Sequence, residues 1–143
     1  TGFMKNLLDT CVISELVKPR PNTAEPDWLA RTPADRLVLS SLTIGELKRG
    51  ITRLTESKKK SRLRMWHEPL LANYGDRILP VDRAVAEAWG IMQARAEDSG
   101  EKISIVDGYI AATASAHHMT VVTRNEGDFS PSHQAILNPW KML

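Results

Sequence analysis

Several features that define whole classes of protein are scarce in this sequence. One cysteine, Cys11, is present in 143 residues, so no internal disulfide can form and a cytoplasmic location is expected. No apolar run approaches the ~18–20 residues that a membrane-spanning helix needs, and the start lacks the basic and apolar pattern of a secretory signal. There is no glycine-rich phosphate loop, which argues against a nucleoside-triphosphate enzyme. The four histidines form neither a His-x-x-x-His nor a His-Glu-x-x-His pattern, so they are assigned no chemistry.

What is present fits one folded domain. Hydrophobic residues make up 42% of the chain and charged residues 25%, and the formal net charge is only +2. A chain of this length buries a core without disulfides or metals. Thr1, Gly2 and Phe3 precede Met4 and are interpreted as a cloning remnant, so a single domain is predicted over residues 4–143.

Short apolar segments alternate with helical patterns along the chain. Strands are predicted at 5–8, 37–40, 78–81, 120–123 and 135–137, and a turn is predicted at 126–127. Helices are predicted at 12–17, 24–30, 43–72 with breaks, 83–97 and 104–116. This alternation is typical of a three-layer α/β/α fold with a mostly parallel central sheet of about five strands.

Four acidic residues lie where predicted strands end or helices begin. Asp9 follows the first strand, Glu46 and Asp107 lie in first helical turns, and Asp128 follows the fourth strand and its turn. These points share one edge of an open α/β sheet, where ligands bind. Grouped carboxylates repel one another unless a cation offsets the charge, and a set of oxygen ligands favours Mg²⁺, with Mn²⁺ as the alternative.

Each acid also has a purely structural interpretation. The segments beginning at Thr43 and Ser104 match capping boxes, in which Glu46 or Asp107 would satisfy backbone donors at a helix start. Asp9 and Asp128 also suit turns. Asp82 follows a strand as well, but it is interpreted as a helix N-cap and left out of the site. Spacing alone therefore leaves both a metal site and four separate caps open.

Four sequence blocks contain these acids and their neighbours: LLDTCVISE at 7–15, TIGEL at 43–47, DGYIAATA at 107–114 and TRNEGDF at 123–129. They resemble PIN-domain proteins of the VapC and FitB type, which are toxins of bacterial toxin–antitoxin pairs, and the likeness continues through LNPW at 137–140. They occur in the order and spacing of that family and cover essentially the whole chain from Met4. The resemblance implies a PIN-like fold and a Mg²⁺-dependent endoribonuclease.

The resemblance also implies roles for particular residues. Asp9, Glu46 and Asp107 match the family's metal-binding acids, and the fourth acid falls at Asp128 or is replaced by Asn125, with Asp128 preferred here. These four acids are the predicted catalytic and metal-binding set. Polar neighbours are predicted to orient the phosphate of the substrate: Thr10, Ser14, Thr43, Arg124 and Asn125. For Arg124, an ordinary surface charge is an equal alternative.

One position departs from the family pattern. Cys11 stands where the family usually has Asn, which removes an amide that would support Asp9. A thiol is a poor magnesium ligand, so Cys11 is interpreted as a small buried residue.

The implied partners are RNA and protein. The family's substrates are RNAs, commonly structured ones such as transfer RNA cut in a single-stranded loop. The resemblance further implies a homodimer inhibited by a VapB/FitA-type antitoxin, which alone contacts operator DNA. The basic stretch from Lys58 to Arg64 suits an RNA backbone or a solvated helix face. Apolar residues on the early helices are candidate antitoxin contacts or core: Leu16, Val17, Trp28 and Leu29.

Two other functions compete with the nuclease. A catalytically weak binding module would act as antitoxin partner and co-repressor, an alternative motivated by Cys11 and the unsettled fourth acid. A phosphatase or phosphotransferase of another doubly wound fold would instead turn over small phosphate esters. The four tryptophans are interpreted as core or interface residues rather than base-stacking platforms.

Overall fold

The computed structural model describes residues 5–15 and 24–141, with the side chains of 24–26 excepted. The predicted helix positions Leu16 and Val17 lie outside these ranges. None of the helices within them is long and apolar enough to cross a membrane.

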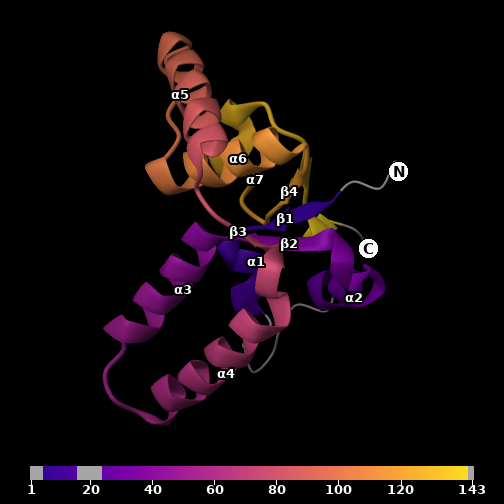
Figure 1. The fold of residues 1–143 in the computed structure, drawn as a ribbon, viewed down its shortest axis with the longest axis vertical. Helices are drawn as coiled ribbons and strands as arrows, with labels where there is room; N and C mark the ends of the chain where they lie inside the picture. Colours follow the sequence, from indigo (N-terminus) through magenta and orange to yellow (C-terminus); the bar gives the residue numbers. More distant parts are fainter. Residues whose placement is uncertain (1–4, 16–23, 142–143) are drawn as a thin grey trace.

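A five-stranded parallel sheet forms the middle of the molecule, in the order β3-β2-β1-β4-β5 (Figure 1). The strands are β1 (Asn6–Leu8), β2 (Leu37–Ser40), β3 (Ile78–Leu79), β4 (Thr120–Val122) and β5 (Ile136–Leu137). In the centre, Leu7 is in register with Val38 of β2 and Val121 of β4. The parallel arrangement confirms the predicted fold class.

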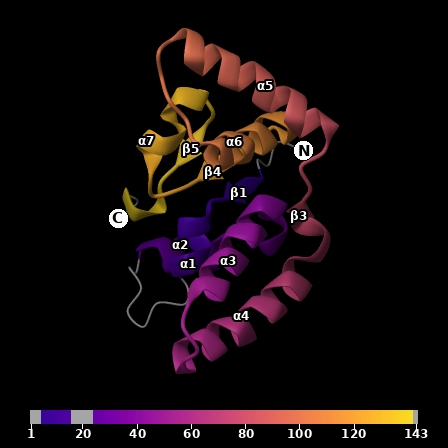
Figure 2. The same ribbon diagram turned by 90° about the vertical axis from the view of Figure 1, so that its left-hand side faces the viewer.

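Helices cover both faces of the sheet (Figures 1 and 2). One layer holds α1 (Thr10–Glu15), α2 (Ala24–Arg31), α3 (Ser41–Arg53) and α4 (Lys58–Tyr74). The other holds α5 (Arg83–Asp98), α6 (Ile105–His117) and α7 (Glu126–Phe129). Short 3₁₀ turns join these elements: η1 (Ala34–Arg36), η2 (Gly75–Arg77), η3 (Ser130–Ser132) and η4 (Pro139–Lys141).

Alternate residues of each central strand pack into two different cores. Leu7, Val38 and Val121 face the α5–α6 layer, whereas Leu8 and Val122 face the layer of α1 to α4. Consecutive strand residues are therefore buried on both sides, as expected for parallel strands between two helical layers. The two cores fix the sheet edge from which the acidic residues project.

Two predicted helix starts are correct. Asp82 Oδ1 accepts a hydrogen bond from the Val85 amide at 3.0 Å, and Ser104 Oγ accepts one from the Asp107 amide at 3.2 Å. Each side chain satisfies an amide that has no partner within the helix.

The predicted start at Thr43 of the helix that follows β2 is wrong. Strand β2 runs directly into α3, and Ser40 is the N-cap, its Oγ accepting from the Leu42 amide at 3.1 Å. Thr43 is therefore an interior helix residue with no exposed surface. Glu46 consequently lies in the second turn of α3 and cannot belong to the predicted capping box.

Two further segments differ from the prediction. The long pattern over 43–72 is two helices, because the chain turns at 54–57 and Ser57 caps α4 by accepting from the Lys60 amide at 3.2 Å. The predicted turn at 126–127 is the first turn of α7, which ends at the fully buried Phe129.

Candidate active site

Asp9 is at the centre of the candidate site because it directly follows the central strand β1. Its amide donates to the Val122 carbonyl at 2.9 Å, so the backbone remains joined to β4. Its side chain accepts from the Thr10 amide at 2.8 Å and from Thr123 Oγ1 at 2.9 Å. With 6% of its surface exposed, the carboxylate is held in one orientation.

Burial disfavours the charged form of the Asp9 carboxyl. Loss of solvation raises the pKa of its carboxyl above the usual range, and the nearby charge of Glu46 raises it further. Hydrogen bonds from Thr123, Thr10 and Cys11 act in the opposite direction. A cation beside Asp9 would therefore relieve an electrostatic cost already present in the protein.

Glu46 reaches the same region from α3. Thr10 Oγ1, in the first turn of α1, donates to Glu46 Oε1 at 2.6 Å. Thr10 thus contacts both acids, through its amide to Asp9 and through its hydroxyl to Glu46.

Asp107 approaches from the opposite layer, in the first turn of α6. Its half-buried carboxyl has a pKa raised to about 6, mainly by loss of solvation. The charges of Asp9, Asp128 and Glu46 raise it further, while a hydrogen bond with Ser104 lowers it. The other three predicted acids therefore lie within electrostatic reach of Asp107.

The fourth acid is the most exposed of the set. Asp128 lies on α7 with an exposed side chain, and Asn125 occupies the N-cap position of the same helix without capping it through its side chain. Both residues thus come from one short element.

Carboxylates affect one another's pKa over longer distances than those at which they can share one metal ion. Within residues 5–15 and 24–141, no three His, Cys, Asp or Glu side chains are close enough together to form a ready-made metal cluster. Coulomb interactions fall off only as 1/r, so carboxylates can raise one another's pKa beyond the distance of a shared ion. The four acids therefore interact electrostatically, and Glu46 is also hydrogen-bonded to Thr10.

The other predicted polar residues divide by accessibility. Ser14 Oγ donates to the Thr10 carbonyl at 2.8 Å, one turn along α1. Arg124 is exposed, and its guanidinium lies 5.3 Å from the centre of the Trp140 ring. Thr43 is fully buried and its Oγ1 has no hydrogen-bond partner, so the predicted contact with substrate is inconsistent with its position inside α3.

Sequence reasoning missed Thr123 as a site residue. It is fully buried at the end of β4, where its hydroxyl donates to Asp9 and accepts from the Asn125 amide at 3.0 Å. Because β4 is the parallel neighbour of β1, the residue after β4 comes to lie beside the residue after β1. Thr123 therefore links Asp9 to the loop that leads to α7.

Cys11 supports Asp9 only weakly. Its Sγ lies 3.5 Å from Asp9 Oδ2 and accepts a long hydrogen bond from the Arg124 amide. Burial and then the charge of Asp9 raise the pKa of the thiol to about 11, so it remains neutral at pH 7.

The raised pKa of Asp107 predicts a pH-dependent stability difference. A carboxyl whose folded pKa exceeds its unfolded value of 3.8 stabilises the fold when protonated, and this contribution is lost as pH rises through about 6. In EDTA, we expect Asp107→Asn to raise the free energy of unfolding at pH 7.5 by on the order of 1 kcal/mol, after allowance for partial exposure. The gain should shrink at pH 4.5, as measured by urea denaturation.

The matched control is Asp35→Asn, which makes the same chemical change at an exposed carboxylate in η1. A gain for Asp107→Asn that is equal at both pH values would contradict the electrostatic interpretation.

The fold and the four interacting acids indicate the class of protein to which the chain belongs. The PIN domain family model matches residues 7–130, and the chain belongs to this family. It is 40% identical to Toxin FitB of Neisseria gonorrhoeae over 135 residues, which cover 94% of this chain and 97% of that protein. It is 38% identical to VapC ribonuclease Y4jK of Sinorhizobium fredii, again over 94% of this chain and 97% of that protein.

A solved structure gives the same result in three dimensions. The chain superposes with a TM-score of 0.89 and 40% identity on a structure of FitAB bound to the IR36 DNA fragment, covering 94% of this chain and 95% of the matched chain.

Proposed function

We propose that this protein is the toxin of a toxin–antitoxin pair, an endoribonuclease that hydrolyses RNA and is inhibited by its cognate antitoxin. The observation that carries the proposal is the placement of Asp9, Glu46, Asp107 and Asp128 in one electrostatic neighbourhood, on a PIN domain similar over nearly its whole length to a VapC ribonuclease.

The site's chemistry fits a divalent ion, for which we propose Mg²⁺ with Mn²⁺ as the alternative. The donors are carboxylate oxygens, which Mg²⁺ prefers. The pKa of Asp107 is raised mainly by loss of solvation and further by three neighbouring carboxylates. Asp9 and Asp107 would hold the ion, with Glu46 and Asp128 contributing directly or through water. Such an ion, when bound, acidifies water and neutralises charge on a phosphate.

The chain's own residues prepare this site. The Thr10 amide and the Thr123 hydroxyl fix both oxygens of Asp9 before any ligand arrives, so no reorientation is needed on binding. Glu46 Oε1 is occupied by Thr10, which leaves Oε2 to accept a hydrogen bond from the attacking water. Arg124, Asn125 and Ser14 lie on the flanking elements and are proposed to orient the phosphate.

The proposed assembly follows the relatives. We propose a single domain over residues 4–143, a homodimer, and action in the cytoplasm on RNA, including structured RNA such as tRNA. A VapB/FitA-type antitoxin would cover the acidic site, and the toxin would reach operator DNA only through it.

A second function is favoured by one observation. The FitB relative is found with FitA on a DNA fragment, so a repressor complex is a role that a FitB-like chain can fill. A catalytically weak co-repressor would keep antitoxin and operator binding without cutting RNA.

The deciding experiment incubates antitoxin-free protein with total RNA in Mg²⁺, in Mn²⁺ and in EDTA. We expect discrete cleavage that needs the metal and stops when the cognate antitoxin is added, and sequencing the cut ends identifies the target. Folded protein that neither cuts RNA nor binds metal by calorimetry, yet represses with its antitoxin, would establish the co-repressor instead.

Thr123→Val tests how Asp9 is positioned. The change keeps the side-chain shape but removes the hydroxyl that lowers the pKa of Asp9, so that pKa should rise further. We expect cleavage to fall about 10–100-fold, the usual cost of losing a group that orients a metal ligand. The acid limb of the pH–rate profile should also move to higher pH.

The control for Thr123→Val is Thr113→Val. Thr113 is equally buried, but its hydroxyl donates to the Tyr109 carbonyl within α6. If both variants lose activity only in proportion to lost stability, Thr123 has no positioning role.

A further inference from the structure

The hairpin of α3 and α4 carries a larger net positive charge than the whole chain does. Residues 41–65 contain eight Lys and Arg against two Glu, a net charge of +6 on a chain whose total is only +2. The two helices extend side by side away from the sheet (Figures 1 and 2). The remainder of the chain is therefore net negative, and the excess of positive charge lies in this hairpin.

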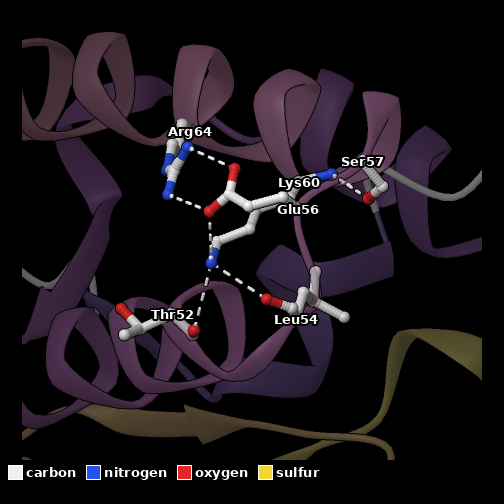
Figure 3. Close-up of polar contacts among 6 residues, drawn as sticks. All are labelled: Thr52, Leu54, Glu56, Ser57, Lys60 and Arg64. Atoms are coloured by element: carbon white, nitrogen blue, oxygen red, sulfur yellow. Dashed lines mark hydrogen bonds and ion pairs between the residues drawn. The ribbon is translucent and has the colours of Figure 1, made fainter.

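Two of these cations maintain the hairpin itself (Figure 3). Lys60 is 7% exposed, and its Nζ donates to the Leu54 carbonyl at 2.9 Å and the Thr52 carbonyl at 3.3 Å while pairing with Glu56 at 3.0 Å. Arg64 pairs with the same Glu56 carboxylate at 3.0 Å. Lys60 thus joins the end of α3 to the start of α4, and Arg64 joins α4 to the turn between them. Both cations are therefore engaged in contacts within the protein.

Between the two helices lies a groove that reaches the candidate site. It has a volume of about 200 Å³ and a mostly apolar lining. Its lining includes both groups of the Thr10–Glu46 hydrogen bond, together with Leu47, Gly50, Ile51, Leu63 and Trp66. One end of the groove is therefore acidic and belongs to the site.

Helical spacing places free cations along both walls of this groove. On α3, Arg49 and Arg53 lie three and seven positions after Glu46, on the same stripe as the groove-lining Gly50. On α4, Lys59 and Arg62 share the stripe of Leu63 and Trp66.

All four side chains are exposed, unlike Lys60. The groove accordingly has an apolar floor and an acidic end, and exposed cations lie next to its lining residues on both helices.

We propose that this groove binds the single-stranded RNA substrate, with Arg49, Arg53, Lys59 and Arg62 holding backbone phosphates as the strand enters the acidic site. The proposal rests on the proposed nuclease function. Four cations on two walls can contact successive phosphates, and an apolar floor suits unstacked base faces. The Lys60–Glu56–Arg64 contacts keep the two walls at a fixed separation.

The test measures RNA binding separately from cleavage. A fluorescein-labelled, single-stranded RNA oligonucleotide is titrated by anisotropy in the Asp9→Asn background, where cutting does not interfere. The groove variant changes all four wall residues to Gln. Its control changes four exposed cations outside the hairpin to Gln, which gives the same net charge: Lys5, Arg83, Arg95 and Lys102.

A single-residue pair sharpens the comparison. Arg62→Gln and Arg64→Gln make the same change two positions apart on α4, but only Arg64 is engaged by Glu56. We expect Arg62→Gln to weaken RNA binding more than Arg64→Gln does. Urea denaturation checks that each variant is folded.

For the groove variant we expect the Kd to rise at least about 10-fold and the slope of log Kd against log salt to fall by up to about 3, at roughly 0.7 per phosphate contact. In otherwise wild-type protein, KM should rise while kcat stays within about twofold, because the change removes binding that is uniform along the reaction.

Equal losses in the groove variant and its charge-matched control would overturn the proposal, as would unchanged RNA binding with lost inhibition by antitoxin, which would mark a protein interface. Either result leaves the proposed function intact if cleavage by the wild type still requires Asp9. Cleavage that persists in Asp9→Asn would instead overturn the proposed function.

Discussion

We expect Asp9→Asn to lower kcat for RNA cleavage by at least about 10²-fold, in the range seen when one preorganised electrostatic group is removed from an active site. The substitution keeps the side-chain size but removes the negative charge at the point where β1 meets α1. Neutralising the residue relieves the cost of burying its charge, but Asn replaces one of the two accepting oxygens with an amide nitrogen, which accepts no hydrogen bond. These effects oppose each other, so we expect the free energy of unfolding at pH 7 to change by no more than about 1–2 kcal/mol. The variant should therefore be folded and inactive.

Single-turnover cleavage with Mg²⁺ measures the rate, urea denaturation measures the free energy of unfolding, and calorimetric titration measures metal binding. Asp35→Asn serves as the control because it makes the same change at an exposed position in η1. Full activity in Asp9→Asn, or a loss matched in Asp35→Asn, would show that the carboxylate of Asp9 is not part of the machinery.

Phe129→Ala should have the largest effect on stability. Phe129 ends α7 with no exposed surface and packs in the core shared with Leu7, Val38 and Ile110. Removing a buried phenyl ring costs about 3–5 kcal/mol, through lost burial and the cavity left behind. Asp128 immediately precedes Phe129, so the same change should also weaken the exposed side of the candidate site.

Chemical denaturation measures the loss, with Ile91→Ala as the control. Ile91 is 56% exposed on α5, and its truncation should stay within about 0.5 kcal/mol. A loss below about 1 kcal/mol for Phe129→Ala would mean that α7 is not anchored by its ring.

Much of the fold could be predicted because parallel strands leave a clear pattern. Residues 37–40 are consecutively buried, and the predicted strand has the same bounds as β2. The acids were found for a related reason, since the carboxyl ends of parallel strands share one edge of the sheet. Asp9, at the end of β1, and Asp107, on α6, thus lie within electrostatic reach of each other although they are far apart in sequence.

The errors arise where local patterns compete. Thr43 matched a capping box, but β2 passes into α3 without a loop, so the cap is Ser40, three residues earlier. The turn between α3 and α4 depends on the buried Lys60, a residue type that sequence reasoning places on the surface. Thr123 was missed because its importance depends on strand order, which periodicity does not specify.

The hydrogen bonds of Asp9 have a consequence for how the site opens. Its amide extends the ladder between β1 and β4, and its carboxylate is tied to Thr123 at the end of β4. These two strands are at the middle of the sheet, so we expect amide hydrogens there to be among the slowest to exchange. Asp128 belongs to a four-residue helix with an exposed face, which we expect to open locally at a lower free energy. In hydrogen exchange, the Asp9 side of the candidate site should therefore be protected for longer than the Asp128 side.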